Sequence, residues 1–110
     1  MQATDANPIH VDSAADLATL IADRDRLLVE FFTEGCGVCA SMEPVLGVVA
    51  KETDVTVALV NPRDDPVLIE EYDIQSVPTL VLFEDGAVVD RLAEGFVGAE
   101  RLIGFVSAAD

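Results

Sequence analysis

The amino-acid sequence predicts an α/β fold, in which a mixed β-sheet has helices on both faces. Apolar, β-prone runs alternate with segments whose apolar residues recur at helical spacing, and this alternation is typical of β-α-β units. Asp85-Gly86 separates the last two β-prone runs and is a strong signal for a hairpin turn. We therefore expect the order β-α-β-α-β-α-β-β-α, with parallel strands first and an antiparallel hairpin near the end.

The first half of the chain contains two predicted strand–helix pairs. Asp12-Ser13 offers N-cap side chains for the first helix, and the second helix opens at Cys36 and contains Pro44. The predicted elements are a short strand over Pro8–Val11, a helix to about Asp23, a strand over Leu27–Thr33 and a helix from Cys36 to about Glu52.

The second half of the chain contains a buried strand, a short helix, the hairpin and a last helix. Pro66 suits the first turn of the short helix, and Gly98 precedes the last helix. The predicted elements are a strand over Val55–Asn61, a loop over Pro62–Asp65, a helix to about Tyr72, strands over Thr79–Phe83 and Ala87–Leu92, and a helix over Ala99–Ala108.

The length and the composition predict one small domain with a real core. The chain has 110 residues, and half of them are apolar, so two cysteines are not needed to hold the fold together. Residues 1–7 are polar and lack a signal-peptide pattern, so we expect a flexible N-terminal extension on a single domain, 1–110. No apolar run could cross a bilayer. We expect a cytoplasmic protein that does not bind membranes, where a dithiol is catalytic or binds metal.

The charge of the chain is strongly negative. Twenty-one acidic residues face six basic ones, which gives a net charge of −15. Such a surface repels nucleic acid, so we expect no nucleic-acid partner. High acidity also accompanies disorder, but abundant Val, Leu, Ile and Phe argue against it. We interpret the acidity as a halophilic adaptation, because concentrated salt screens the repulsion between like charges.

Two cysteines with two residues between them follow the apolar run Leu27–Thr33. This order places Cys36 at the N-terminus of a helix, where free backbone N–H groups and the helix dipole favour a thiolate. Cys39 lies one turn further on, within disulfide reach. Redox chemistry is the favoured interpretation. Half of a metal site shared between chains is the alternative, but the remaining soft ligand, His10, is distant in sequence and is expected to be solvated, so we expect no metal.

Several short motifs occur together along the chain. They are Glu30-Phe31-Phe32 before Cys36-Gly37-Val38-Cys39, then Pro44, Val77-Pro78-Thr79, Asp85-Gly86 and Gly95. In this combination the chain resembles the thioredoxin family over roughly residues 8–106. The resemblance implies a five-stranded sheet of order 1-3-2-4-5 flanked by four helices, with Cys36 as the attacking thiol and Cys39 as the resolving thiol. Gly35 stands where the family usually has tryptophan, and Val38 where it usually has proline.

The resemblance also implies a third catalytic residue. Glu30 matches the buried acid that lies beneath the dithiol in the family, usually an aspartate. Burial raises the pKa of a carboxyl group, so Glu30 could accept the proton of Cys39 during resolution. Leu59 stands where many members have a lysine near this acid, so desolvation should dominate the pKa of Glu30. The alternative is that Glu30 is a strand-end acid that simply reaches water.

The implied substrate-binding residues flank the dithiol. Pro78 matches the family's cis-proline, and the backbone of Val77 before it would pair with a bound substrate strand. An ordinary trans turn at Pro78 is the alternative, and a β-bulge is the alternative at Gly95. Together with these three positions, Gly37 and Val38 between the cysteines are expected to contact the substrate.

The resulting functional expectation is a protein-disulfide reductase. Its redox group is the Cys36–Cys39 pair itself, with no other cofactor. The resemblance implies disulfide-containing client proteins and a thioredoxin reductase or equivalent electron donor as partners, and we expect a monomer. The alternative is a thioredoxin-fold binding, redox-sensing or chaperone module. A binding module tends to lose one of the two cysteines or Pro78, whereas this chain has all three.

Overall fold

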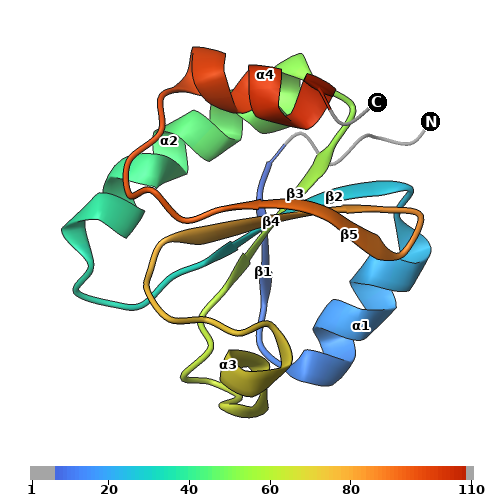
Figure 1. The fold of residues 1–110 in the computed structure, drawn as a ribbon, viewed down its shortest axis with the longest axis vertical. Helices are drawn as coiled ribbons and strands as arrows, with labels where there is room; N and C mark the ends of the chain where they lie inside the picture. Colours follow the sequence, from blue (N-terminus) through green and yellow to red (C-terminus); the bar gives the residue numbers. More distant parts are fainter. Residues whose placement is uncertain (1–6, 109–110) are drawn as a thin grey trace.

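A computed structural model describes residues 7–108 and confirms the predicted fold class. One five-stranded sheet has the order β1-β3-β2-β4-β5, as the resemblance implied (Figure 1). β1, β3 and β2 are parallel, and β4 is antiparallel to both β2 and β5. The elements are β1 (Ile9–Val11), α1 (Ala14–Asp23), β2 (Arg26–Phe31), α2 (Gly37–Glu52), β3 (Thr56–Val60), α3 (Val67–Glu71), β4 (Thr79–Glu84), β5 (Ala87–Leu92) and α4 (Ala99–Ala108).

The boundaries of the elements follow the local chemistry that the sequence indicated. Ser13 is the N-cap of α1, and its Oγ accepts a hydrogen bond from the backbone N–H of Asp16 at 3.0 Å. Asp85 and Gly86 both have positive φ, +52° and +86°, as a type I′ hairpin turn requires. The expected N-terminal extension, residues 1–7, lies outside the described residues except for Asn7.

β2 ends two residues earlier than expected, and this difference shapes the site. The predicted strand ran to Thr33, but β2 ends at Phe31. One further backbone bond joins β2 to β3, from the N–H of Phe32 to the carbonyl of Val60 at 3.0 Å. The chain then turns, and the N–H of Cys36 donates to the carbonyl of Thr33. Because the run of apolar residues continues past the last backbone hydrogen bond of the strand, the sequence predicts a strand that is too long.

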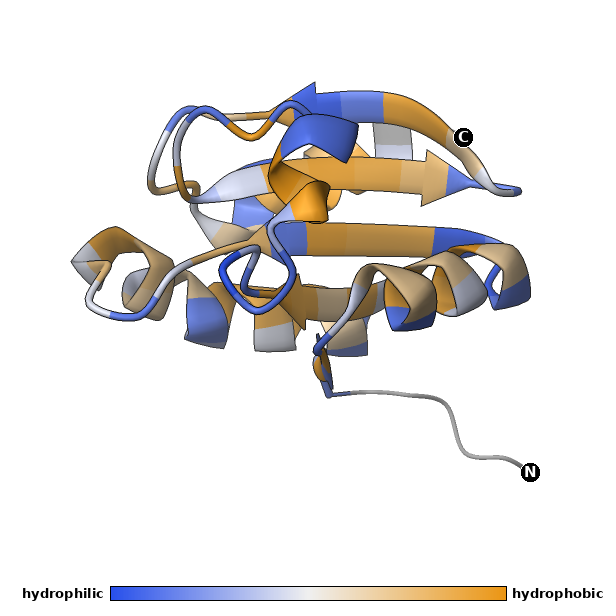
Figure 2. Cartoon of the chain, turned by 90° about the horizontal axis from the view of Figure 1, so that it is seen from below, coloured by the Kyte–Doolittle hydropathy of each residue, from blue (hydrophilic) through white to orange (hydrophobic). Residues whose placement is uncertain are grey.

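The sheet separates two hydrophobic cores. α2 and α4 cover one face, where Met42, Leu46 and Leu102 pack on alternate residues of the central strands (Figure 1). α1 and α3 cover the other face, where Leu17 and Leu68 pack on the strand residues that point to that side of the sheet. The middles of the strands are hydrophobic, whereas the outer turns and loops are largely hydrophilic (Figure 2). Within residues 7–108, no helix is long and apolar enough to span a membrane.

Arg26 ties elements together at the end of the sheet opposite the cysteines. Its guanidinium pairs with Glu84 of β4 at 3.0 Å and with Asp54, between α2 and β3, at 2.6 Å. It also donates to the carbonyl of Val106 in α4. These contacts hold the start of β2, and the site lies beyond the other end of the same strand.

Candidate redox site

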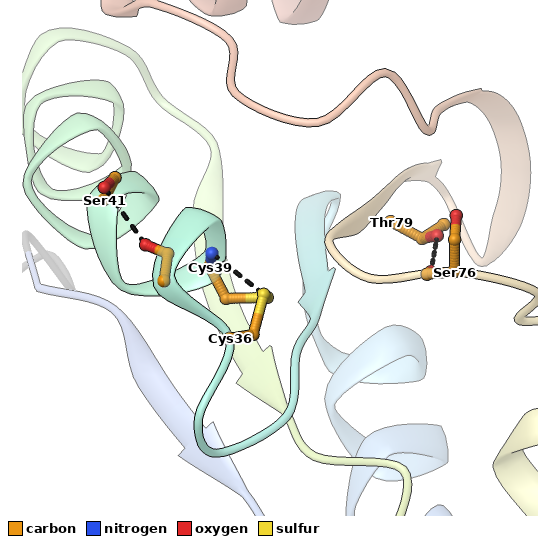
Figure 3. The surroundings of a disulfide bond; sticks show 6 residues. Cys36, Cys39, Ser41, Ser76 and Thr79 are labelled. Carbon is orange, nitrogen blue, oxygen red and sulfur yellow. Dashed lines mark hydrogen bonds between the residues drawn. A yellow bond between two sulfur atoms is a disulfide. The ribbon is translucent and has the colours of Figure 1, made fainter.

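The two cysteines form a disulfide at the N-terminus of α2, as the sequence predicted for an oxidised pair. Their Cα atoms are 5.2 Å apart (Figure 3). Cys36 is the N-cap residue, and its Sγ accepts a hydrogen bond from the backbone N–H of Cys39 at 3.1 Å. Gly35 precedes it with φ +83°, a left-handed conformation that disfavours other residues. The loop therefore delivers one sulfur atom to the free N–H groups of a helix end.

The two cysteines differ in exposure. Cys36 is partly buried, whereas only 3% of Cys39 is exposed. Gly37 and Val38 between them are exposed, and Val38 presents an apolar side chain to solvent. An incoming disulfide can therefore reach Cys36 first, while Cys39 lies a turn inside the helix.

Glu30 lies in the middle of the sheet and does not reach water. It is 1% exposed, and its β-ladder neighbours are Leu59 on β3 and Leu80 on β4, both buried. Within the described residues, its Oε2 has no hydrogen-bond partner. Glu30 shares the sheet face of Leu28, which packs in the core beneath α2. The strand-end alternative is therefore wrong, because β2 pairs on both sides at this position.

The pKa of Glu30 is raised to about 8 from an ordinary value near 4.5. Desolvation by burial is the main cause, and the negative charge of Glu43 adds to it. Glu43 belongs to α2, four residues after Cys39, so it lies one helical turn beyond the resolving cysteine. Leu59, where the family often has lysine, supplies no positive charge that would lower this pKa.

The loop before β4 lies across from the disulfide (Figure 3). The peptide bond between Val77 and Pro78 is cis. Pro78 is buried and Val77 is partly buried. The hydroxyl of Thr79 donates to the carbonyl of Ser76 at 2.6 Å and closes the loop around this bond.

The segment between β5 and α4 lies beside the first turns of α2 (Figure 1). It contains Gly95, which has φ +84°. The backbone N–H of Val97, a residue buried in the core, donates to Sδ of Met42 at 3.4 Å. Phe96, between Gly95 and Val97 in the chain, has 56% of its surface exposed. The segment is thus anchored to α2 while it presents an aromatic ring to solvent.

Sequence reasoning missed two residues of this region. Glu43 was not connected with Glu30, although its spacing of four from Cys39 would have placed it on the same helix face. Phe96 follows Gly95 in the sequence, but its exposure is visible only in the structure, so no sequence pattern identified it. His10 is exposed on β1 and lies edge-on to Phe32, with ring centroids 6.2 Å apart. Among residues 7–108, no three His, Cys, Asp or Glu side chains gather as metal ligands.

Comparison with known proteins gives one consistent family. The family model described as Thioredoxin matches residues 8–108. The thioredoxin of Chlamydia caviae is 37% identical over 100 residues, which cover 90% of this chain and 96% of that protein. The bifunctional thioredoxin reductase/thioredoxin of Mycobacterium leprae is 33% identical over 86 residues, 76% of this chain and 19% of that protein. The structure of a mutant thioredoxin from Halobacterium salinarum NRC-1 superposes with a TM-score of 0.93 at 30% identity and covers 99% of this chain and 96% of that one.

Proposed function

This chain belongs to the thioredoxin family, whose members are protein-disulfide oxidoreductases, and on that premise we propose how its residues divide the reaction. Cys36 attacks the disulfide of a client protein, and Cys39 resolves the mixed disulfide. The single observation that supports this assignment is the asymmetry of the pair. Sγ of Cys36 accepts an N–H bond at the helix end and is partly exposed, whereas Cys39 is buried.

The reaction exchanges one disulfide for another. The Cys36 thiolate bonds to one sulfur of the client disulfide, and the other client sulfur leaves as a thiolate. Glu30 then accepts the proton of the Cys39 thiol, and the new thiolate attacks Cys36 Sγ. The second client sulfur leaves, the client is reduced by two electrons, and the Cys36–Cys39 disulfide seen here remains. The redox group is the cysteine pair itself, and the family does not need another cofactor.

Reduction of insulin disulfides by dithiothreitol tests the reaction. The chain should speed the onset of turbidity, and Cys36→Ser should be no faster than dithiothreitol alone, because the attacking thiolate is missing. Far-ultraviolet circular dichroism of both proteins checks that the fold is retained. A wild-type chain that does not speed the reaction would favour the alternative, a thioredoxin-fold binding, redox-sensing or chaperone module.

We propose that the client segment lies across the cysteines. Its backbone would pair with that of Val77, and its side chains would contact Gly37, Val38, Pro78 and Gly95. The exposure of Val38 and the loop across from the disulfide support this placement.

Members of the family act with thioredoxin reductase and disulfide substrates. We propose a thioredoxin reductase or an equivalent donor for this chain, with support from the Mycobacterium leprae relative whose name joins both activities. The chain would act as a single-domain, cytoplasmic monomer. The net charge of −15 supports the absence of nucleic-acid partners and of binding to acidic membranes.

We propose a halophilic protein, and thermal melts in potassium chloride test this. Repulsion between exposed charges reaches about 30 Å at 0.01 M salt but only about 3 Å at 1 M. The melting temperature should therefore rise by about 5 °C or more over this range, since 1 kcal/mol shifts it by about 4–8 °C in a domain of this size. A flat midpoint would contradict the halophilic interpretation and leave the dithiol chemistry untouched. The net charge and the likeness to the Halobacterium salinarum thioredoxin support it.

A further inference from the structure

A small cavity near the dithiol is lined by the segment that follows β2, the loop between β3 and α3, α3 itself and the loop before Pro78. Its volume is about 170 Å³. Its lining is largely apolar and includes Ile69, Ile74 and the residue next to the cis-proline, Val77. Arg63 is the one charged side chain among the described residues that line it. The cavity thus combines an apolar floor with a single cation.

Arg63 is held in place through its backbone, while its guanidinium has no bonded partner among residues 7–108. The side-chain oxygen of Asn61 accepts a hydrogen bond from the N–H of Arg63 at 2.9 Å, and the carbonyl of Asn61 accepts one from Asp64 at 3.0 Å. Pro62 between them is buried. Glu34 and Asp64 line a neighbouring cavity with Arg63, but neither forms an ion pair with it within the described part of the chain.

This free guanidinium is unusual for the molecule. With 21 acidic residues available, the other four arginines all bond to oxygen atoms of the chain. Of the other lysine and arginine side chains, only that of Lys51, in the last turn of α2, also lacks a hydrogen-bond or ion-pair partner among residues 7–108. An unpaired guanidinium presents a fork of N–H donors that suits a carboxylate.

We propose that this cavity binds the client segment next to the attacked disulfide, with an apolar side chain on its floor and a neighbouring carboxylate on Arg63. The inference rests on the proposed reductase function and adds a substrate preference to it. Two residues that line the cavity adjoin the reaction site. Thr33, which lines it, accepts the N–H of Cys36, and Val77, which also lines it, precedes the cis-proline.

A pair of synthetic disulfide peptides tests the charge preference. The two peptides are identical except for Leu-Glu or Leu-Gln beside one cysteine. Reduced protein is mixed with each peptide at about 0.01 M salt, where exposed charges are least screened, and acid quenching with mass spectrometry gives the rate constant of its oxidation. The ratio of the two rate constants is then compared between Arg63→Gln and Lys51→Gln. These variants have the same net charge, so the overall repulsion of the Glu peptide cancels.

We expect the Glu/Gln ratio to be about two- to fivefold lower in Arg63→Gln than in Lys51→Gln, as for an exposed ion pair of up to about 1 kcal/mol. Lys51→Gln should lower the ratio only by the effect of one lost positive charge on the overall repulsion, which both variants share. Equal ratios in the two variants would overturn the proposal while the reductase function stands. A wild-type protein that reduces neither peptide, while circular dichroism shows that it is folded at this salt concentration, would overturn both.

The same experiment also tests the apolar floor of the cavity. A third peptide has Gly-Glu in place of Leu-Glu, and Ile69→Ser makes the floor more polar. The preference of the wild-type protein for the Leu peptide should shrink about two- to tenfold in this variant, because serine removes part of the apolar surface on which the leucine side chain packs. An unchanged Leu/Gly ratio would contradict the assignment of the floor.

Discussion

Cys39→Ser should stop turnover and leave the client proteins bound to Cys36 as mixed disulfides. The attack of Cys39 on Cys36 is intramolecular, over Cα atoms 5.2 Å apart. Well-oriented intramolecular reactions have effective molarities of about 10⁵–10⁸ M, and no external thiol at millimolar concentration replaces that. We therefore expect at least about a thousandfold loss of turnover. Mass spectrometry of the trapped adducts, after alkylation of free thiols, identifies the linked cysteine.

Cys36→Ser is the matched control for this experiment. It loses the sulfur of the more accessible cysteine, which accepts the helix N–H bond, and retains that of the buried one, so it should trap almost nothing. Adducts found mainly on Cys39 in Cys36→Ser would reverse the assignment of the two cysteines. Rapid turnover by Cys39→Ser would show that the second sulfur is not needed for resolution.

The fold and the reacting pair could be predicted because each rests on local patterns. The hairpin follows from Asp85-Gly86, since few residue pairs adopt two successive positive φ angles. The cysteine pair follows from its spacing at a strand-to-helix transition. The order of the strands came from the family resemblance and not from these patterns, and the structure confirms it.

The surroundings of Glu30 and Arg63 could be predicted only in part, because they depend on contacts between distant segments. The resemblance indicated that Leu59 leaves Glu30 without a nearby cation. The effect of Glu43 on the pKa of Glu30 could not be predicted, because it depends on how α2 packs over β2. The cavity beside Arg63 joins residues from the segment after β2, the loop between β3 and α3, α3 and the loop before β4, which no local pattern connects. The exact end of β2 was also missed, since hydrophobicity does not report the last hydrogen bond of a strand.

The pKa of Glu30 predicts how the stability of the fold depends on pH. A carboxyl group with a pKa near 4.5 in the unfolded chain and about 8 in the folded chain binds its proton more tightly when folded. Its contribution to the free energy of unfolding is therefore complete below pH 4.5 and is lost as the pH rises to about 8. Glu30→Gln removes this loss. The stability of the variant relative to wild type should increase across this window by a few kcal/mol, since one pKa unit corresponds to about 1.4 kcal/mol.

Denaturant unfolding at about pH 5 and about pH 9 measures the stability of the variant relative to wild type near the two ends of this pH range. Glu43→Gln is the control. Glu43 is exposed and acts on Glu30 only through its charge. Its replacement should lower the pKa of Glu30 slightly and so narrow the pH range over which stability changes. Many other acids titrate in the same chain, but they are common to wild type and variant and cancel in the comparison. A Glu30→Gln chain whose relative stability is the same at both pH values would contradict a raised pKa.

Glu30→Gln should also slow the resolution step about 10²- to 10⁴-fold, the usual contribution of a general base, and leave the first attack nearly unchanged. A pKa of about 8 lies close to that of an ordinary thiol, about 8.5, so transfer of the proton from Cys39 to Glu30 is nearly balanced in free energy. Rapid-quench measurements can separate the appearance of the mixed disulfide from its decay. In the wild-type protein, decay should accelerate with pH and level off once Glu30 is ionised, near its pKa of about 8. The variant should lose this levelling, because the Cys39 thiol must then give its proton directly to solvent. Equal decay rates in both proteins would leave Glu30 without a part in the chemistry, and its burial beneath α2 would then have to be explained by packing alone.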